Sequence, residues 1–199
     1  MKTYGLTGGV GMGKSTVADC LRQRGLPVMD TDVLARELVE PGQPALAEIA
    51  HAFGSEFIGE DGRLLRDKLA GVVFNDATER ARLESILHPR ITARWRDAVA
   101  EWRRQNLRAA VVVIPLLFET GVEAEFDAVI CVACSPSTQQ ARLADRGWTQ
   151  EEISRRNAAQ WPVERKIACA RHVVWNDGGK ELLAQQLDRI LPAGGGRPS

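Results

Sequence analysis

The stretch GLTGGVGMGKST, residues 5–16, decides the fold expected for this chain. It has five glycines in twelve residues and ends in a lysine followed by two hydroxyl side chains. Glycine weakens regular structure and costs entropy on folding, so this density indicates that something approaches the backbone closely. Gly8, Gly13, Lys14 and Ser15 match the phosphate-binding loop pattern G-x-x-x-x-G-K-[ST]. Successive backbone N–H groups of such a loop surround phosphate oxygens, and the start of the next helix adds partial positive charge.

The segment lies between an apolar, strand-like stretch and a helix-like stretch, which argues against a chance match by a glycine-rich turn. We therefore predict that Lys14 contacts the β- and γ-phosphates of ATP and that the Ser15 hydroxyl binds Mg²⁺. The predicted nucleotide-binding residues of the loop are Gly9, Gly11, Met12, Gly13, Lys14, Ser15 and Thr16.

Five short apolar or β-branched stretches alternate with helix-like segments along the chain. Several are apolar without interruption, as is typical of strands covered on both faces. This alternation predicts a three-layer α/β fold around a five-stranded parallel sheet. The expected strands are residues 2–8, 26–32, 109–117, 127–134 and 171–177.

Capping residues indicate where the helices begin and end. A helix over residues 14–24 is expected to end at Gly25, and Pro162 is expected to end the helix that follows residue 149. Each predicted N-cap carries an oxygen that accepts from the first helical N–H groups. The predicted N-caps are Asp76, Ser135 and Thr149.

Two long stretches without strands interrupt the alternation. Residues 34–107 are predicted to be a helical insertion at one edge of the sheet, and residues 136–170 a second, arginine-rich helical excursion. His88 precedes a proline, so its backbone is expected to leave the helix. Residues 192–199 are expected to be disordered.

The chain carries 26 Lys and Arg against 26 Asp and Glu residues, so no net field attracts it to nucleic acid or an acidic membrane. Its longest apolar run, residues 109–118, is far short of the roughly 20 residues that span a bilayer. We expect a cytoplasmic protein without a signal peptide, whose cysteines are free thiols. Cys131, Cys134, Cys169 and His172 resemble a zinc set, but an i, i+3 pair on a strand points to opposite faces.

The acidic residues narrow the class of phosphate-loop protein. The Asn-Lys-x-Asp run that reads the base in GTPases is missing, and the third expected strand has no acid before Glu119. Asp30 and Asp32 instead follow the second strand, where a carboxylate can accept a proton from an attacking hydroxyl. This favours a small-molecule kinase with Asp32 as the base; the alternative is that Asp32 caps a helix at Leu34. Asp30 either contacts the metal or the substrate, or it is a solvated polar residue at the end of the strand.

Short motifs follow one another along the chain in a fixed order. They are GLTGGVGMGKST (5–16), DTDVLAREL (30–38), LHPRI (87–91), PLLFE (115–119), QQARLADRGWTQEE (139–152), RNAAQ (156–160) and VVWNDG (173–178). Together these motifs resemble the dephospho-coenzyme A kinase family over residues 2–190. That family transfers the γ-phosphoryl group of ATP to the ribose 3′-hydroxyl of dephospho-CoA. The resemblance implies a P-loop kinase fold like that of nucleoside monophosphate kinases, with a core (1–59, 107–137 and 171–191), a helical CoA-binding insertion (60–106) and a lid (138–170).

The resemblance extends the predicted site. Arg142, which we place with Arg146 on one face of a lid helix, is expected to bind ATP and act in catalysis beside Lys14 and Asp32, and Asn176 to contact adenine. The expected acceptor-binding residues are Asp32, Arg36, His88, Leu117 and Glu119. Other roles remain open for several of these residues. Arg36 is a surface charge in the alternative, and His88 and Arg90 form hydrogen bonds to nearby protein groups. Core packing is the alternative for Leu116, Leu117 and Phe118.

The chain departs from the family pattern at Val113, where an Asp is frequent, and at Arg171. Another small-metabolite or nucleoside monophosphate kinase is the alternative function. A nucleotide-gated binding module without chemistry is a third possibility, which the balanced charge and Asp32 argue against. The sequence leaves a monomer and a weak homo-oligomer both open.

Overall fold

The computed structural model describes residues 1–191, which form two compact units. One unit comprises Met1–Asp30 and the described part of Val99–Ser199, and the other comprises Thr31–Ala98. The first unit contains the parallel sheet and the second is mainly helical. The predicted alternation of strands and helices therefore belongs to the first unit.

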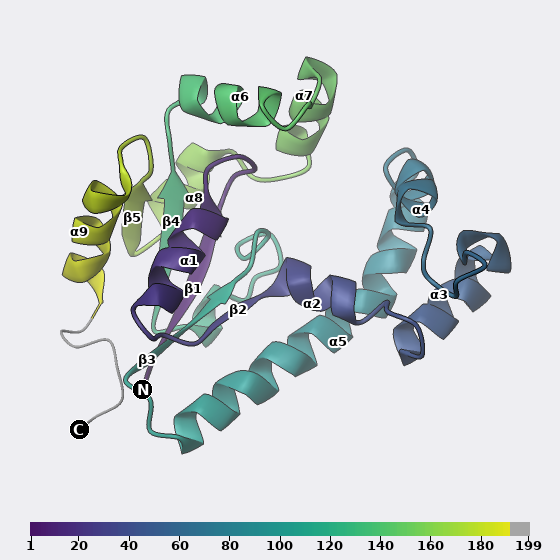
Figure 1. Cartoon of the computed structure of the whole chain (residues 1–199), viewed down its shortest axis with the longest axis horizontal. Coiled ribbons are helices and arrows are strands. Elements are labelled where there is room, and N and C mark those ends of the chain that lie inside the picture. Colours follow the sequence, from purple (N-terminus) through teal and green to yellow (C-terminus); the bar gives the residue numbers. More distant parts are fainter. Residues whose placement is uncertain (192–199) are drawn as a thin grey trace. The chain divides into compact units, whose positions relative to one another are not determined.

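Within residues 1–191, the sheet has five strands in the order β2-β3-β1-β4-β5, and every neighbouring pair is parallel (Figure 1). The predicted parallel five-stranded sheet is thus confirmed. All strands end at the same edge, where β1 leads into the glycine-rich segment. The strands are β1 (Lys2–Gly8), β2 (Val28–Asp30), β3 (Ala109–Val113), β4 (Ala128–Ala133) and β5 (His172–Trp175).

Four of the five strands are shorter than predicted, and β2 and β3 differ most from their predicted ranges. β2 ends at Asp30 because helix α2 (Thr31–Glu37) begins at the next residue. β3 ends at Val113, and the chain turns over residues 115–121, so Pro115 and Glu119 follow the strand and are not part of it. The apolar character of residues 114–118 reflects burial in this turn, since Leu117 has no exposed surface.

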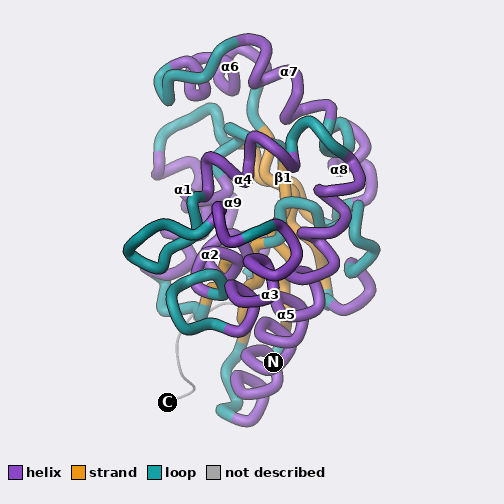
Figure 2. The backbone as a smooth tube through the Cα atoms, turned by 90° about the vertical axis from the view of Figure 1, so that its right-hand side faces the viewer, coloured by secondary structure: helices purple, strands orange, loops and turns teal. Residues whose placement is uncertain are grey.

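Helices cover both faces of the sheet. α1 (Lys14–Gln23) and α9 (Lys180–Ile190) pack on one face, and α8 (Val163–Cys169) lies on the opposite side of the strands (Figure 2). α6 (Pro136–Ala144) and α7 (Gln150–Ala158) connect β4 to α8, and a short 3₁₀ helix, η2 (Glu123–Glu125), precedes β4. This is the expected three-layer arrangement.

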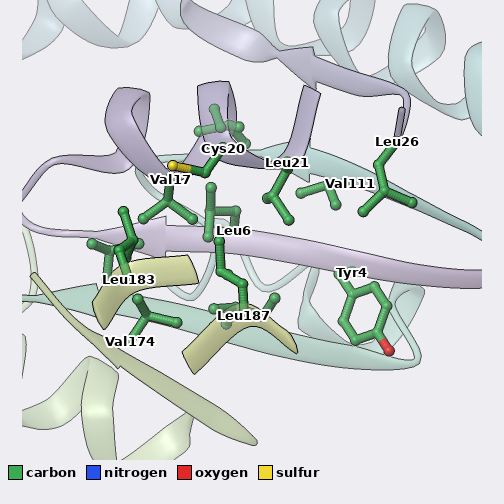
Figure 3. Packing of buried hydrophobic residues seen from close by; sticks show 14 of the residues in the cluster. Tyr4, Leu6, Val17, Cys20, Leu21, Leu26, Val111, Val174, Leu183 and Leu187 are labelled. Carbon is green, nitrogen blue, oxygen red and sulfur yellow. The ribbon is translucent and has the colours of Figure 1, made fainter. Parts of the chain in front are cut away.

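The main core lies between the sheet and the helices α1 and α9. Leu6 of β1 is fully buried between Val17 and Leu21 of α1 and Leu187 of α9 (Figure 3). Burial of each such side chain stabilises the fold by roughly 1.5–3 kcal/mol relative to exposure. This packing fixes the start of α1, and hence the segment before it, against β1.

The predicted helix ends are confirmed in this unit. Gly25 follows α1 with a φ of 75°, and its N–H donates to the Arg22 carbonyl at 2.8 Å. Ser135 accepts from the Thr138 N–H, and Thr149 forms a reciprocal capping box with Glu152. α7 ends at Ala158, ahead of Pro162, as expected.

The second unit has its own apolar core, built around Ile49, Leu69 and Ile86. Its elements are α2, α3 (Pro44–Phe53), η1 (Ser55–Phe57), α4 (Arg66–Val73) and the first part of α5 (Ala77–Arg104), which continues into the first unit. Asp76 accepts from the Thr78 N–H at 2.7 Å, which confirms its predicted cap.

The prediction that His88 leaves the helix is wrong. α5 runs through Pro89 without interruption, and His88 is an exposed residue within it. Ile86 and Trp95 are buried on either side of the proline, at 4% and 3% exposure. Tertiary packing therefore outweighs the local preference of the residue before a proline.

The edge strand β5 is covered by a side chain. The Gln186 amide of α9 accepts from the Trp175 N–H at 2.8 Å and donates to the Trp175 carbonyl at 2.9 Å. Across residues 1–191, we find no helix with the length and apolar composition that a membrane span requires. The segment predicted to be disordered, residues 192–199, lies outside the described residues.

Candidate active site

The glycine-rich segment forms a tight loop between β1 and α1. Gly13 is the N-cap of α1 in the left-handed conformation, with φ 89° and ψ 31°. A Cβ at Gly13 would overlap the Asn176 amide, and a Cβ at Gly8 would overlap the Val132 carbonyl oxygen. Both positions therefore require glycine, for backbone conformation and for space.

The Lys14 ammonium lies over the loop that precedes it. Its Nζ donates to the carbonyl oxygens of Gly8 at 2.8 Å and Gly9 at 3.0 Å. Ser15 is exposed in the first turn of α1, and this turn contains no acidic residue. The loop therefore brings a cation and a hydroxyl to the start of α1, a helix terminus of the kind that can bind phosphate.

Side chains from distant segments hold this loop. Asn176, at 3% exposure, donates through Nδ2 to the Met12 carbonyl at 3.0 Å. Gln139 of α6 donates through Nε2 to the Val10 carbonyl at 2.6 Å. The structure therefore places Asn176, predicted to contact adenine, directly against the phosphate loop. Gln139 was not singled out by the sequence, because its partner is far away along the chain.

Arg142 brings a second cation to the loop. Its NH2 group donates to the Asn176 carbonyl at 2.8 Å, and its NH1 group lies beside Gly13. Within residues 1–191, this buried NH1 group has no hydrogen-bond partner. An unsatisfied charged donor is costly to bury, so an anion beside Gly13 would be stabilised there.

The predicted helix face shared by Arg142 and Arg146 is wrong. α6 ends at Ala144, and Gly147, with a φ of 78°, closes the turn that follows. Arg146 lies in this turn, past the last helical residue. Arg142 is in the last turn of α6.

A polar cluster lies next to the loop at the same edge of the sheet. Lys166, with no exposed surface, donates through Nζ to the Pro115 carbonyl at 2.7 Å and contacts Glu119 Oε1 at 2.8 Å. Thr7, the residue before Gly8, donates through Oγ1 to the same Pro115 carbonyl at 3.1 Å. The Trp161 N–H donates to Glu119 Oε1 at 2.8 Å. We call Thr7, Pro115, Glu119, Trp161 and Lys166 the Glu119–Lys166 cluster.

Sequence reasoning found Glu119 but missed Lys166. A signal was present, because Val163, Lys166 and Ile167 form a stripe at i, i+3 and i+4 on α8. These three residues are buried or half-buried. A lysine in an apolar stripe is unusual enough to predict a buried partner.

The apolar residues before Glu119 belong to the core. Leu117 is fully buried against Gly5, and Phe118 stacks on Trp161 with ring centroids 6.1 Å apart. Core packing, the alternative for these side chains, therefore accounts for their positions. Leu116 is the half-buried member of the three.

The remaining predicted acceptor residues lie in the second unit. Asp32 and Arg36 are exposed and four residues apart on α2, so they lie on one side of that helix. The alternative in which Asp32 caps a helix at Leu34 is wrong, because α2 begins at Thr31 and already contains Asp32. On α5, His88 is exposed, whereas Arg90 donates to the Ile86 carbonyl and pairs with Glu48.

At Val113, where the family frequently has an Asp, the neighbouring strand carries a carboxylate instead. Val113 is 1% exposed in the main core, and Asp30 is its register partner on β2. Asp30 therefore supplies a carboxylate at the carboxyl edge of the sheet within the first unit. The other departure, Arg171, is an exposed residue just before β5.

Two cysteines near the site, Cys131 and Cys134, are buried, and their surroundings disfavour the thiolate. Burial raises the pKa of the Cys131 thiol to about 11, although the charges of Lys166 and Lys14 oppose this shift. Burial also raises the pKa of Cys134. Cys20, Cys131, Cys134 and Cys169 are free cysteines, and within residues 1–191 no group of three or more Asp, Glu, His or Cys side chains is arranged to hold a metal.

A family model described as dephospho-CoA kinase matches residues 3–181. The chain belongs to the dephospho-CoA kinase family. A dephospho-CoA kinase of Anaeromyxobacter dehalogenans is 47% identical over 192 residues, which cover 96% of this chain and 91% of that protein. The family assignment confirms the predicted resemblance and supports it over another small-metabolite kinase.

Solved structures of related proteins agree with the fold. The protein TT1252 of Thermus thermophilus is 35% identical, with a TM-score of 0.81 and 95% of each chain covered. A dephospho-CoA kinase from Campylobacter jejuni has the same fold at 22% identity, with a TM-score of 0.70 and 94% of each chain covered. These structures support the predicted P-loop kinase fold, and the family assignment makes the chain a kinase.

Proposed function

We propose that this chain transfers the γ-phosphoryl group of ATP to the ribose 3′-hydroxyl of dephospho-CoA, giving CoA and ADP. The family match over residues 3–181 carries this proposal. The phosphate loop with its two cations, Lys14 and Arg142, supports ATP as the donor.

In the proposed reaction the acceptor oxygen attacks the γ-phosphorus in line with the departing oxygen of ADP. The new bond joins the 3′-oxygen to phosphorus, the bond to the β,γ-bridging oxygen breaks, and no phosphoenzyme forms. Lys14 and Arg142 stabilise the charge on the transferred group, and the loop N–H groups hold the triphosphate in position. Asp32 accepts the proton of the 3′-hydroxyl.

Magnesium is the proposed metal. The Ser15 hydroxyl, at the start of α1, and the Asp30 carboxylate, at the end of β2, are hard oxygen donors at the carboxyl edge of the sheet. Mg²⁺ binds through one or two such groups, keeps several waters and takes its other ligands from substrate phosphates, so a cluster of three acids is not needed. The bound ion would neutralise charge on the β- and γ-phosphates.

The proposed acceptor-binding residues are those that the family resemblance predicts. Glu119 has one carboxylate oxygen without a partner among residues 1–191, and Arg36 and His88 are exposed. Leu117 is retained as an acceptor residue only if the 115–119 turn moves, since it is buried. Asn176 remains the proposed adenine contact. The proposed division into core, CoA-binding insertion (60–106) and lid (138–170) follows the family resemblance.

The proposed partners are small molecules only, with no nucleic acid and no membrane. The proposed location is the cytoplasm, where ATP is made and where the four cysteines stay reduced. A monomer and a weak homo-oligomer are both compatible with this function.

An acceptor panel with coupled detection of ADP tests the substrate. Dephospho-CoA is expected to give turnover far above AMP, CMP, shikimate or gluconate. Higher turnover with any of the other four compounds would replace the proposed acceptor. Salt-sensitive RNA binding without phosphoryl transfer would instead favour a binding module.

Asp32→Asn tests the base. We expect at least a 100-fold loss of kcat, because the variant cannot accept the proton, while ATP affinity measured by calorimetry stays within threefold. Glu37→Gln, at another exposed acid of α2, is the matched control and should retain kcat within twofold. Wild-type turnover by Asp32→Asn would remove Asp32 from the mechanism.

A further inference from the structure

Lys166 is the largest side chain of residues 1–191 that is fully buried. Removing an ammonium from water costs several kcal/mol, which is recovered only when the charge is paired and its donors are satisfied. Such a residue in a small enzyme requires an explanation beyond packing, because an apolar side chain would fill the space at lower cost.

Lys166 links α8 to the turn that carries Glu119. Its Nζ contacts the Pro115 carbonyl at 2.7 Å and Glu119 Oε1 at 2.8 Å. The Pro115 carbonyl also accepts from Thr7, which precedes the phosphate loop. Lys166 therefore holds the Glu119 carboxylate against the Pro115 carbonyl of the same turn, and Thr7 connects that carbonyl to the end of β1.

The two oxygens of Glu119 differ in their surroundings. Oε1 accepts from the Trp161 N–H and from Lys166. Oε2 is buried and has no hydrogen-bond partner among residues 1–191. The Glu119 side chain keeps 15% of its surface exposed, and it lies at the edge of the sheet to which the phosphate loop belongs. A buried carboxylate oxygen of this kind is stabilised by an O–H or N–H donor.

We infer that Lys166 is a positioning residue for the acceptor: it fixes Glu119 by Oε1, and Oε2 accepts a hydrogen bond from a hydroxyl or N–H group of the acceptor. This inference rests on the proposed function. Lys166 itself does not touch the acceptor and acts through Glu119. Trp161 assists because its N–H also donates to Glu119 Oε1 and its ring stacks on Phe118.

The competing explanation is that the ion pair only braces the fold. In that case Lys166→Met would lower the melting temperature and affect the KM values of ATP and acceptor alike. Positioning of Glu119 instead predicts an effect confined to the acceptor. The two explanations therefore predict different changes in KM: a rise for both substrates if the ion pair only braces the fold, and a rise for the acceptor alone if Lys166 positions Glu119.

The experiment measures steady-state kinetics with ATP and dephospho-CoA for Glu119→Gln, Lys166→Met and the double variant. We expect each single change to lower kcat/KM for dephospho-CoA roughly 10- to 100-fold, mainly through KM, with the KM for ATP within twofold. The double variant should lose no more than the worse single variant, because both changes remove one interaction.

Lys180→Met is the matched control, since it removes the same atoms from an exposed lysine at the start of α9. Its acceptor KM should stay within twofold of wild type. Melting temperatures are measured for all variants; if Lys166→Met does not fold, Lys166→Arg replaces it. Arginine keeps a buried cation but displaces it from Oε1, so a threefold or greater rise in acceptor KM is expected.

Three results would overturn the inference: Lys166 variants that match Lys180→Met, equal rises in both KM values, or additive losses in the double variant. Failure of the proposed function looks different, because the wild-type protein itself would then not phosphorylate dephospho-CoA. The two failures are therefore separated by the first measurement of the series.

Discussion

The phosphate loop and the Glu119–Lys166 cluster lie at the same edge of one sheet, but they are held by different kinds of contact. The loop is shaped by its own glycines, by its own Lys14 ammonium, which donates to Gly8 and Gly9, and by neutral hydrogen bonds from Asn176 and Gln139. The cluster depends on one buried charge that bridges α8 and the turn after β3. The loop presents backbone groups that any phosphate chain can use, whereas the cluster presents a single oriented carboxylate. On the proposed assignment, ATP would bind mainly through backbone groups of the loop, and the acceptor would be recognised by the Glu119 carboxylate.

The largest effect is expected at the loop cation. Lys14→Ala should lower kcat roughly 1000-fold and weaken ATP binding, because it removes the charge that is proposed to stabilise the transferred phosphate. Kinetics and ATP calorimetry measure the two losses, and Lys180→Ala is the control. A Lys14→Ala enzyme with more than a tenth of wild-type activity would mean that the loop works through its backbone alone.

A backbone change should have the next largest effect. Gly13→Ala puts a side chain at a φ of 89° and into the Asn176 amide, so the free energy of unfolding should fall by about 2 kcal/mol or more. Nucleotide affinity should fall at least tenfold. Gly71→Ala is the matched control: it lies inside α4 with open space around it, and should raise stability by about 0.5–1 kcal/mol. Chemical denaturation and calorimetry provide both values.

The smallest effect is expected for a carboxylate at the start of β4. The Thr3 amide donates to Asp127 at 2.6 Å and lowers the pKa of that carboxyl. A lowered pKa means that the contribution to stability is present above about pH 4 and is lost as the pH falls through the folded-state pKa. Asp127→Asn should cost about 1 kcal/mol or less at pH 7, since the group is exposed, with kcat unchanged.

Denaturation of both proteins from pH 7 to pH 2 measures this difference. The gap in unfolding free energy between wild type and Asp127→Asn should narrow as the pH is lowered. A gap that is constant over this range would show that the charge of Asp127 does not matter. Loss of kcat would show that the sheet transmits changes at its far edge to the site.

The parts of the molecule that depend on local chemistry could be predicted from the sequence. β1 was expected over residues 2–8 and is found there, because a β-branched, apolar stretch leads into an unmistakable loop. The Ser135 and Thr149 caps were predictable for the same reason, since each cap bonds within three residues. The family assignment followed from the order of these short motifs.

Contacts between distant segments could not be predicted. Gln139 bonds to Val10 across 129 positions, and Lys166 bonds to Pro115 across 51. The apolar stripe on α8 indicates that Lys166 is buried, but it does not indicate which residue Lys166 contacts. Val10 and Pro115 accept through backbone carbonyls, which every residue has, so neither can be recognised from the sequence. Pro89 is the opposite case. The proline strongly predicted a helix break at His88, but α5 continues through it because the helix is packed on both sides of the proline.

The Gln186 amide that bonds to Trp175 bears on aggregation through the edge strand β5. An outer strand with unpaired backbone groups invites another polypeptide to extend the ladder, which is a common route to aggregation. Here the N–H and C=O of Trp175 are already occupied by a side chain of the same molecule. An incoming strand would have to displace that amide at this position before it could pair.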